Sequence, residues 1–230
     1  MSWRSDVAPT LNEGDVRLRP LKASDARAWQ EVRRRNQAWL GPWDATVPDE
    51  GVRAGEVPPS FHAMTRRLRA EARAGRVLPW ATEFRGRLVG QITMGGIAYG
   101  SLRSAYIGYW IDQEFAGRGV TSMGVAMATD YAFDVLRLHR MELNIRPENT
   151  SSRAVAEKVG YREEGFREKY LHINGDWRDH VTYVLLAGDL PAGVVAGLRA
   201  PFCCKIRFPI QYFWSGRVNR EASLRFTRVP

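Results

Sequence analysis

Residues 104–133 read SAYIGYWIDQEFAGRGVTSMGVAMATDYAF, and this stretch decides the fold. Its first part, up to Ile111, consists mostly of β-formers, and the residues after Thr121 are dense in Ala, Met and Val, which is typical of a buried helix. A loop containing Gly117 and Gly119 joins the two parts. The first turn of a helix offers free backbone N–H groups, and glycine has no Cβ to keep an anion away, so the stretch predicts a phosphate or pyrophosphate site.

The spacing of these glycines excludes two common nucleotide motifs. A P-loop would need Gly-x-x-x-x-Gly-Lys-Ser/Thr, which does not occur here. A Rossmann fingerprint would need a third Gly or Ala at the position of Ser122. The ligand must therefore be recognised by another kind of phosphate loop.

Two segments together resemble the GNAT N-acetyltransferase superfamily. The loop resembles the family pattern Gln/Arg-x-x-Gly-x-Gly/Ala at Gly119 and departs from it at Ala116 and Thr121. About thirty residues further on, 149–161 resembles the family segment Asn-x-x-Ser-x-x-(apolar)-x-x-Lys-x-Gly-Phe/Tyr. Flanking phrases, at 108–111 and 170–180, look like the RimJ/RimL branch, which acetylates α-amino groups of ribosomal proteins. The resemblance covers roughly residues 14–190.

The resemblance implies an α/β GNAT fold. Its central sheet is expected to be mixed and mostly antiparallel, flanked by helices, with one parallel strand pair splayed at the cofactor site. The acetyltransferase domain is expected over residues 1–190, followed by a basic, aromatic extension over 191–230. The implied reaction is transfer of acetyl from acetyl-CoA to the N-terminal α-amine of a protein, for example a ribosomal protein, without a metal.

The family also implies which residues bind acetyl-CoA. Backbone N–H groups of the loop are expected to hold the pyrophosphate, and those near Trp110 to polarise the thioester carbonyl. The Asn149 side chain is expected to hold the pantetheine amides, and Ser152 to lie near the thioester sulfur. The expected cofactor-binding residues are Trp110, Ile111, Ala116, Gly117, Arg118, Gly119, Val120, Thr121, Asn149 and Ser152.

Two residues are candidates for the chemistry. A thiolate with a pKa of about 8.5 needs only a hydrogen bond for its stabilisation, which the Ser152 hydroxyl can donate. Glu142, on a strand expected to part from Tyr109 and Trp110, is a candidate base or water relay. The structural alternatives are a helix cap at Ser152 and a paired surface carboxylate at Glu142.

The acceptor amine itself needs little help from a base. An α-amino group with a pKa near 8 is about one tenth neutral at pH 7, whereas a lysine is neutral about once in 2,500. This difference favours an α-amine acceptor. The residues expected to contact it are Trp43, Glu83, Tyr109, Tyr170 and His180. A tryptophan that simply pins a helix to the core is the alternative for Trp43.

The remaining chain predicts the rest of the sheet and its helices. Because a strand–helix–strand unit crosses over right-handed, the strand after the long helix is expected to lie parallel to residues 104–111. That helix should reach about Leu136. Expected strands are Asp15–Pro20, Trp80–Phe84, Leu88–Met94, Ser104–Ile111, Met141–Ile145, Phe166–Ile173 and Trp177–Leu186, and expected helices run from an N-cap at Ser24 to about Leu40, from Ser60 to Ala74, over Thr150–Val159 and over Pro191–Arg199.

Composition limits the other possibilities. The 230 residues carry a net charge of +9, but residues 191–230 hold seven basic residues against Glu221 alone, so the core is nearly balanced. Direct nucleic-acid binding is therefore expected, if at all, through the extension. The adjacent Cys203 and Cys204 provide no disulfide framework, and no run is apolar enough for a membrane span, which favours a cytoplasmic protein. The sequence leaves open whether it is a monomer or a homodimer.

Two other functions stay open on the sequence. One is acetylation of a small amine, such as an antibiotic or a polyamine. The other is a non-catalytic module that binds acyl-CoA or associates with RNA, which the departures at Ala116 and Thr121 and the basic extension allow.

Overall fold

The computed structural model describes residues 8–48 and 60–199. The extension from residue 200 and most of the loop predicted over 43–59 lie outside these ranges. In chain order the elements are β1 (Leu11–Glu13), β2 (Val16–Pro20), α1 (Ala26–Arg35), α2 (Gln37–Leu40), α3 (Phe61–Arg73), β3 (Leu78–Phe84), β4 (Arg87–Ala98), β5 (Ser104–Ile111), α4 (Val120–Asp130), β6 (Arg140–Ile145), α5 (Thr150–Val159), β7 (Arg162–Ile173), β8 (Asp176–Leu186) and α6 (Val194–Arg199).

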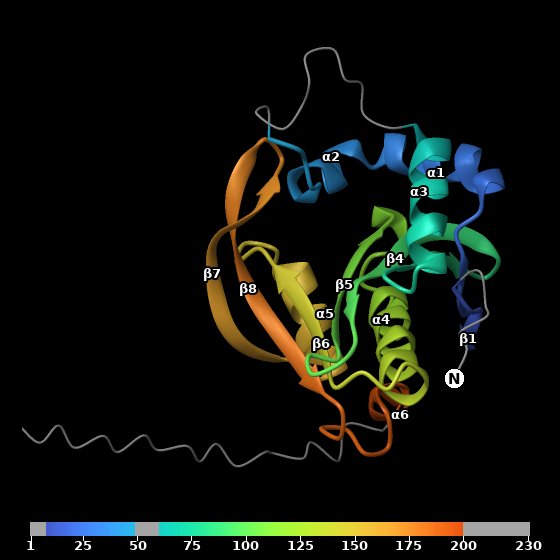
Figure 1. Cartoon of the computed structure of the whole chain (residues 1–230). Helices are drawn as coiled ribbons and strands as arrows, with labels where there is room; N and C mark the ends of the chain where they lie inside the picture. The colour runs from blue at the N-terminus through green and yellow to red at the C-terminus, as the bar shows by residue number, and fades with distance from the viewer. Residues whose placement is uncertain (1–7, 49–59, 200–230) are drawn as a thin grey trace, which may run out of the picture. The chain divides into compact units, whose positions relative to one another are not determined.

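The strands form one sheet in the order β1-β2-β3-β4-β5-β6-β8-β7 (Figure 1). Every neighbouring pair is antiparallel except β5 and β6, which are parallel. α4 stands between β5 and β6 in the chain, and such a crossover connection joins parallel strands. The predicted mixed, mostly antiparallel sheet is therefore confirmed.

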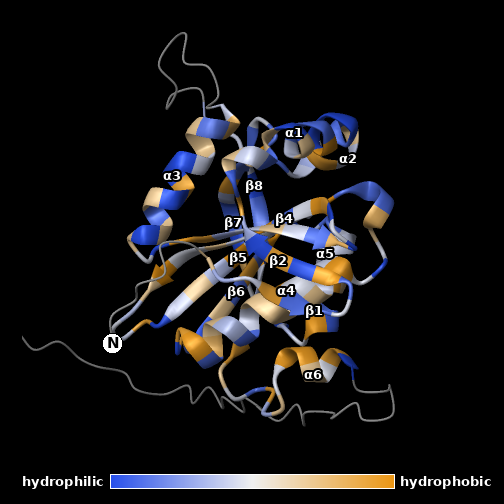
Figure 2. Cartoon of the chain, turned by 90° about the vertical axis from the view of Figure 1, so that its right-hand side faces the viewer, coloured by the Kyte–Doolittle hydropathy of each residue, from blue (hydrophilic) through white to orange (hydrophobic). Residues whose placement is uncertain are grey.

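Helices cover both faces of the sheet (Figures 1 and 2). α1 and α3 lie on one face, where Trp29 packs against Phe61 and Trp110. α4 lies on the other, and it is buried along most of its length because its side chains are small and apolar. Gly124 allows a close approach to the sheet, since a Cβ there would lie 2.5 Å from Cδ1 of Ile92. Within residues 8–48 and 60–199, no helix is long and apolar enough to span a membrane.

β5 and β6 separate partway along their length. Their pairing covers Ser104–Tyr106 against Arg140–Glu142, although β5 continues to Ile111 and β6 to Ile145. Beyond Tyr106 the two strands no longer share hydrogen bonds in the ladder. The splayed parallel pair is confirmed, and it opens the sheet next to the N-termini of α4 and α5.

The N-terminal helix ends at Leu40 as predicted, but it differs from the prediction at its start and is broken in the middle. Ser24 lies inside a 3₁₀ turn, Ala23–Asp25, and α1 begins at Ala26, so the predicted N-cap is wrong. The carboxylate of Asp25 accepts the backbone N–H of Lys22 instead. The helix also breaks at Asn36, whose amide donates to Asp112. This long-range bond explains the break.

The other elements follow the predictions more closely. Ser60 caps α3 by accepting the N–H of Ala63, and Gly160 ends α5 with a φ of 96°. A short strand, β1, was not predicted. α4 is continued by a π-helical turn over Tyr131–Val135, which ends just before Leu136.

The last helix belongs to the same compact unit as the sheet. Val194 is buried, and the N–H groups of Val194 and Val195 donate to the carboxylate of Asp130 in α4. Among the described residues this unit ends at Arg199, and the boundary predicted at residue 190 stays a prediction.

Deleting α6 should therefore destabilise the protein. A chain that ends at Leu190 loses the buried Val194 and leaves Asp130 without its two donors, which we expect to lower the free energy of unfolding by about 2–4 kcal/mol. A chain that ends at Arg199 keeps these contacts and is the control. Urea unfolding of both, beside the full chain, measures the difference. Equal midpoints for the two truncations would show that α6 does not stabilise the domain.

Candidate active site

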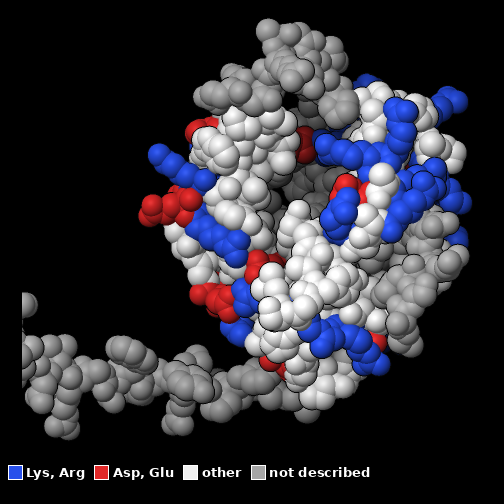
Figure 3. Space-filling view, in the orientation of Figure 1, with Lys and Arg blue, Asp and Glu red and all other residues white. Residues whose placement is uncertain are grey.

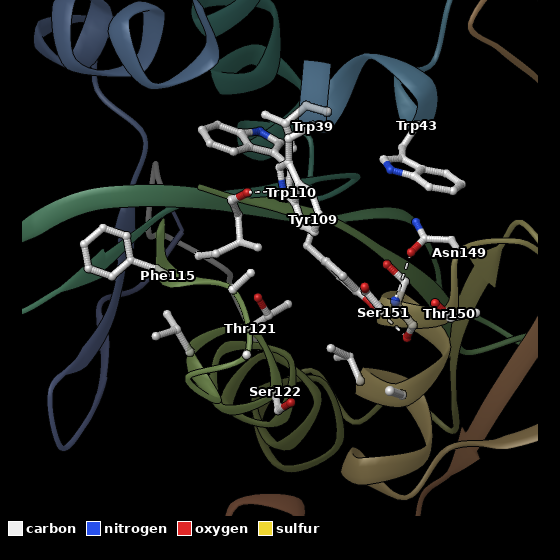
Figure 4. Close-up of a pocket in the computed structure, with 18 of the residues that line it drawn as sticks. Trp39, Trp43, Tyr109, Trp110, Phe115, Thr121, Ser122, Asn149, Thr150 and Ser151 are labelled. Carbon is white, nitrogen blue, oxygen red and sulfur yellow. Dashed lines mark hydrogen bonds between the residues drawn. The ribbon is translucent and has the colours of Figure 1, made fainter. Parts of the chain in front are cut away.

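A cavity of about 350 Å³ lies where β5 and β6 separate (Figure 4). The end of β5 forms one wall, and the first turns of α4 and α5 form another. α2 and the 3₁₀ turn after it, Gly41–Trp43, close the cavity at the far end from α4. Figure 3 shows the molecule hollowed in this region, between α2 and β5.

The end of the cavity at α4 suits an anion. Gly117 and Gly119 have φ values of 75° and 78°, which side chains rarely allow, and no atom lies within 4 Å of the place a Cβ would take at Gly117. No side chain of the described residues caps α4. The backbone N–H groups of its first turn therefore lie at this end of the cavity without a capping acceptor. Nζ of Lys158 lies 3.8 Å from the Cβ position of Gly119 and adds a positive charge.

The middle of the cavity holds three hydrogen-bonding side chains. The Tyr109 hydroxyl donates to the Ser152 carbonyl over 3.3 Å, and burial raises the pKa of Tyr109 to about 12. Oδ1 of Asn149 accepts the backbone N–H of Ser152 at 3.0 Å, so the cap of α5 is Asn149 and not Ser152. The hydroxyl of Ser152 is thus left for another partner, and the Asn149 carbonyl oxygen already has one.

Tryptophans form the end of the cavity opposite α4 (Figure 4). Nε1 of Trp39 donates to the carbonyl of Ile111 at 3.2 Å and so joins α2 to the end of β5. A second hydrogen bond joins the residues just before α2 and just after β5. Nδ2 of buried Asn36 donates to Oδ1 of buried Asp112 at 2.9 Å. The guanidinium of Arg146 lies 5.2 Å from the centroid of the Trp43 ring. These contacts fix both indole rings.

Most of the predicted residues line this one cavity. Arg118 does not belong to its lining, and its guanidinium lies over the ring of Phe115. Of the residues predicted to bind cofactor or acceptor, those in the lining are Trp43, Tyr109, Trp110, Ile111, Ala116, Gly117, Gly119, Val120, Thr121, Asn149 and Ser152.

The two predicted glutamates lie outside the lining of the cavity. Glu142 accepts from Arg140 at 2.7 Å and from Arg167 at 3.1 Å. Glu83 accepts from Arg19 at 2.7 Å. Both carboxylates are thus engaged by arginines, which is the structural alternative for Glu142, and we assign neither of them the role of a base.

Tyr170 and His180 lie together on the last hairpin, also outside the lining. Their rings meet edge to face with centroids 5.6 Å apart, and the Arg167 guanidinium lies 4.6 Å from the Tyr170 centroid. Burial lowers the pKa of His180, and its Nδ1 pairs with the carbonyl of Arg178. The rings of Tyr170 and His180 thus pack against each other, and neither residue lines the cavity.

The sequence reasoning missed several lining residues. Lys158 stands in the segment that resembles the family pattern, so its position could have marked it. Trp39 was not missed, because the phrase Trp39–Trp43 was expected on the acceptor side, but its bond to Ile111 depends on tertiary structure and could not be predicted. Phe115 and Val155 carry no local signal that separates a cavity wall from the core. Among the residues of the two described ranges, no group of three His, Cys, Asp or Glu could hold a metal ion.

Comparison with known families places residues 15–162 in the acetyltransferase (GNAT) domain family. "Putative ribosomal N-acetyltransferase YdaF" of Bacillus subtilis (strain 168) is 32% identical over 174 residues, which are 74% of this chain and 91% of that protein. "Probable N-acetyltransferase YjcK" of the same organism is 40% identical over 103 residues. This alignment spans 45% of the chain and little more than half, 57%, of YjcK.

A solved structure extends the similarity across most of the described residues. Mycobacterium smegmatis RimJ, in complex with CoA-disulfide, superposes with a TM-score of 0.73 at 42% sequence identity. The match covers 80% of this chain and 87% of that one.

Proposed function

Because the chain belongs to the GNAT acetyltransferase family, we propose that it moves the acetyl group of acetyl-CoA to the N-terminal α-amine of a protein, in the manner of the RimJ/RimL ribosomal-protein acetyltransferases. One observation supports this most directly. A single cavity runs from the N-terminus of α4, which no described side chain caps, past Tyr109 and Ser152, to a pair of tryptophans. A ribosomal protein in the cytoplasm is the acceptor we propose.

The chain has the groups that acetyl-CoA requires. The N–H groups of the α4 first turn and Lys158 would hold the pyrophosphate, at the end where Gly117 and Gly119 leave space. The pantetheine arm would lie between the separated β5 and β6, where ladder hydrogen bonds are free. When bound, the thioester supplies the acetyl carbon that the amine attacks.

The protein's own groups would then assist a direct transfer. The neutral amine nitrogen forms a bond to the carbonyl carbon, and the bond from that carbon to sulfur breaks, so that CoA leaves as the thiolate. The proton that the nitrogen gives up passes to water or to this thiolate. Backbone N–H groups near Trp110 would stabilise the carbonyl oxygen. Tyr109 keeps its proton at neutral pH, because its pKa is about 12. If its single O–H turns from the Ser152 carbonyl to the departing thiolate, it can donate a hydrogen bond there together with the Ser152 hydroxyl.

A peptide panel tests the proposal. We would follow CoA release from acetyl-CoA with peptides that carry a free N-terminus, with the same peptides blocked at the N-terminus but containing lysine, and with small amines. Acetylation of the free N-termini, located by mass spectrometry, is the expected result. If CoA binds but no peptide or small amine is acetylated, the proposed function is wrong.

Lys158 should contribute to acetyl-CoA affinity. Replacing Lys158 by Met removes a charge beside Gly119, and a lost charge-assisted contact to phosphate corresponds to roughly tenfold weaker binding. Titration calorimetry with CoA measures the change. Lys169→Met, on β7, is the control with the same change of side chain and should bind CoA like the wild type. Unchanged affinity of Lys158→Met would place the pyrophosphate elsewhere.

Ser152 should matter for turnover more than for binding. We expect Ser152→Ala to lower kcat by about three- to tenfold, because one hydrogen bond to the thiolate is lost, with little change in CoA affinity. The cap of α5 survives, since it uses the Asn149 side chain and the backbone of residue 152. Thermal unfolding should therefore be unaltered. A wild-type kcat would remove Ser152 from the chemistry.

A further inference from the structure

Two carboxylates lie at the tryptophan end of the cavity. Asp44 follows the 3₁₀ turn that carries Trp43, and Glu148 immediately precedes the cap of α5. They are the acidic residues among the described residues that line the cavity. An ammonium group that approaches the thioester from this end meets both.

Each of these carboxylates is already paired with an arginine. Arg33 forms an ion pair with Asp44, and Nε of Arg146 lies 3.3 Å from Oε2 of Glu148. In Figure 3 acidic and basic side chains accordingly stand next to each other around the hollow. The tryptophan end thus offers carboxylate oxygens as hydrogen-bond acceptors, but it carries no excess of negative charge.

The arginines are held in place by other contacts. The Arg33 guanidinium lies over the rings of Trp29 and Trp110, with centroids at 5.6 and 5.4 Å. Arg146 donates to the Pro42 carbonyl at 2.8 Å as well as covering Trp43. These contacts do not involve the carboxylates, so each guanidinium keeps its position, and its charge, beside its carboxylate.

Glu142 on β6, which lies outside the cavity lining, offers no spare charge either. Arg140 and Arg167 both bond to it. Arg140 also pairs with Glu164. A molecule with several ammonium groups therefore finds arginines beside every one of these carboxylates.

This arrangement suits an amine that has to lose a proton. An unpaired carboxylate about 4 Å away would make that loss harder by up to about a thousandfold at an effective dielectric constant of ~20. A hydrogen bond from its own backbone, and after it the charge of Arg146, hold the pKa of Glu148 below its ordinary value. Glu148 is therefore a poor base, and it is suited to orient the amine by hydrogen bonding.

We propose that Asp44 and Glu148, each neutralised by its arginine, select acceptors with a single positive charge at the reacting end and discriminate against linear polyamines. The inference rests on the proposed function and narrows its substrate class. The two ion pairs determine which acceptor is used, whereas Tyr109, Ser152 and the backbone near Trp110 assist the transfer of the acetyl group.

The test compares an N-terminal peptide with spermidine as acceptors of the full-length protein. We expect kcat/KM to be at least a hundredfold higher for the peptide. Arg146→Gln leaves Glu148 unpaired, so we expect it to raise kcat/KM for spermidine by about tenfold and to move the rising limb of the peptide pH profile to higher pH. Arg85→Gln, which breaks an exposed ion pair with Asp15 between two residues outside the cavity lining, is the matched control.

Several outcomes would overturn the inference. One of them is a wild-type kcat/KM for spermidine that lies within tenfold of the value for the peptide. Another is an Arg146→Gln variant that binds CoA normally but keeps the wild-type acceptor ratio and pH profile. Glu148→Gln gives a second route, because it should lower kcat/KM for the peptide without changing CoA affinity, and an unchanged value contradicts us. Acetylation of no amine at all would instead refute the proposed function itself, and the inference with it.

Discussion

Replacing Gly90 by Ala is expected to lower the free energy of unfolding by about 2–3 kcal/mol and to impair CoA binding and turnover together. Gly90 is buried in β4 and pairs with Ile111 of β5. A Cβ at this position would lie 2.5 Å from the carbonyl oxygen of Trp110. Backbone cannot rotate away as a flexible side chain can, so β5 must shift at the point where it forms the cavity wall.

Gly108→Ala is the control for this substitution. Gly108 also lies in the sheet, but no atom is within 4 Å of its Cβ position and its φ is not in the left-handed region. Chemical denaturation and CoA titration of both variants separate close approach from a general effect of alanine in a strand. If Gly90→Ala were as stable as Gly108→Ala, the close contact with Trp110 would not constrain the wall.

The part of the fold that follows from local sequence was predictable. Strand, glycine loop and apolar helix stand in succession over residues 104–133, and a crossover connection through the helix then places β6 parallel to β5. α5 was predicted with its observed bounds, because Gly160 is needed for its left-handed end. In these places, propensity, turn chemistry and tertiary packing favour the same structure.

Features that depend on distant partners were not predictable. The break at Asn36 requires Asp112, which is 76 residues away in the chain. The cap of α5 is another case, because three hydroxyl residues and Asn149 stand together and only the backbone geometry selects Asn149. Local sequence offers several equivalent choices at such positions, and a long-range contact or the path of the backbone selects one of them.

The site shows the same division. Motif residues on the loop and on α5 lie in the cavity because they are adjacent in sequence to the helix N-termini that form it. Glu142 was predicted from its position on a strand alone. Side chains alternate between the two faces of β6, and the Glu142 side chain lies on the face where Arg140 and Arg167 bind it. Sequence specified the strand correctly, but it could not specify which neighbours engage the carboxylate.

The Tyr109 hydroxyl provides the second large effect. We expect Tyr109→Phe to lower kcat by about 10- to 100-fold, since a positioned proton donor typically contributes two or more orders of magnitude and Ser152 remains as a second donor. CoA affinity should stay within about twofold, because the ring and its packing are retained. Stopped assays of CoA release, with affinity measured separately, distinguish the two quantities.

The pH dependence of the rate gives a second test of the role of Tyr109. Because burial raises the pKa of Tyr109 to about 12, the tyrosine stays protonated between pH 7 and 10, and the rise of rate with pH reports the acceptor amine, whose pKa is near 8. Tyr109→Phe should therefore lower the whole profile without moving its rising limb. Tyr106→Phe, on the same strand but outside the cavity lining, should match the wild type. A Tyr109→Phe variant with normal kcat would mean that Ser152 or water alone supplies the thiolate with its hydrogen bond.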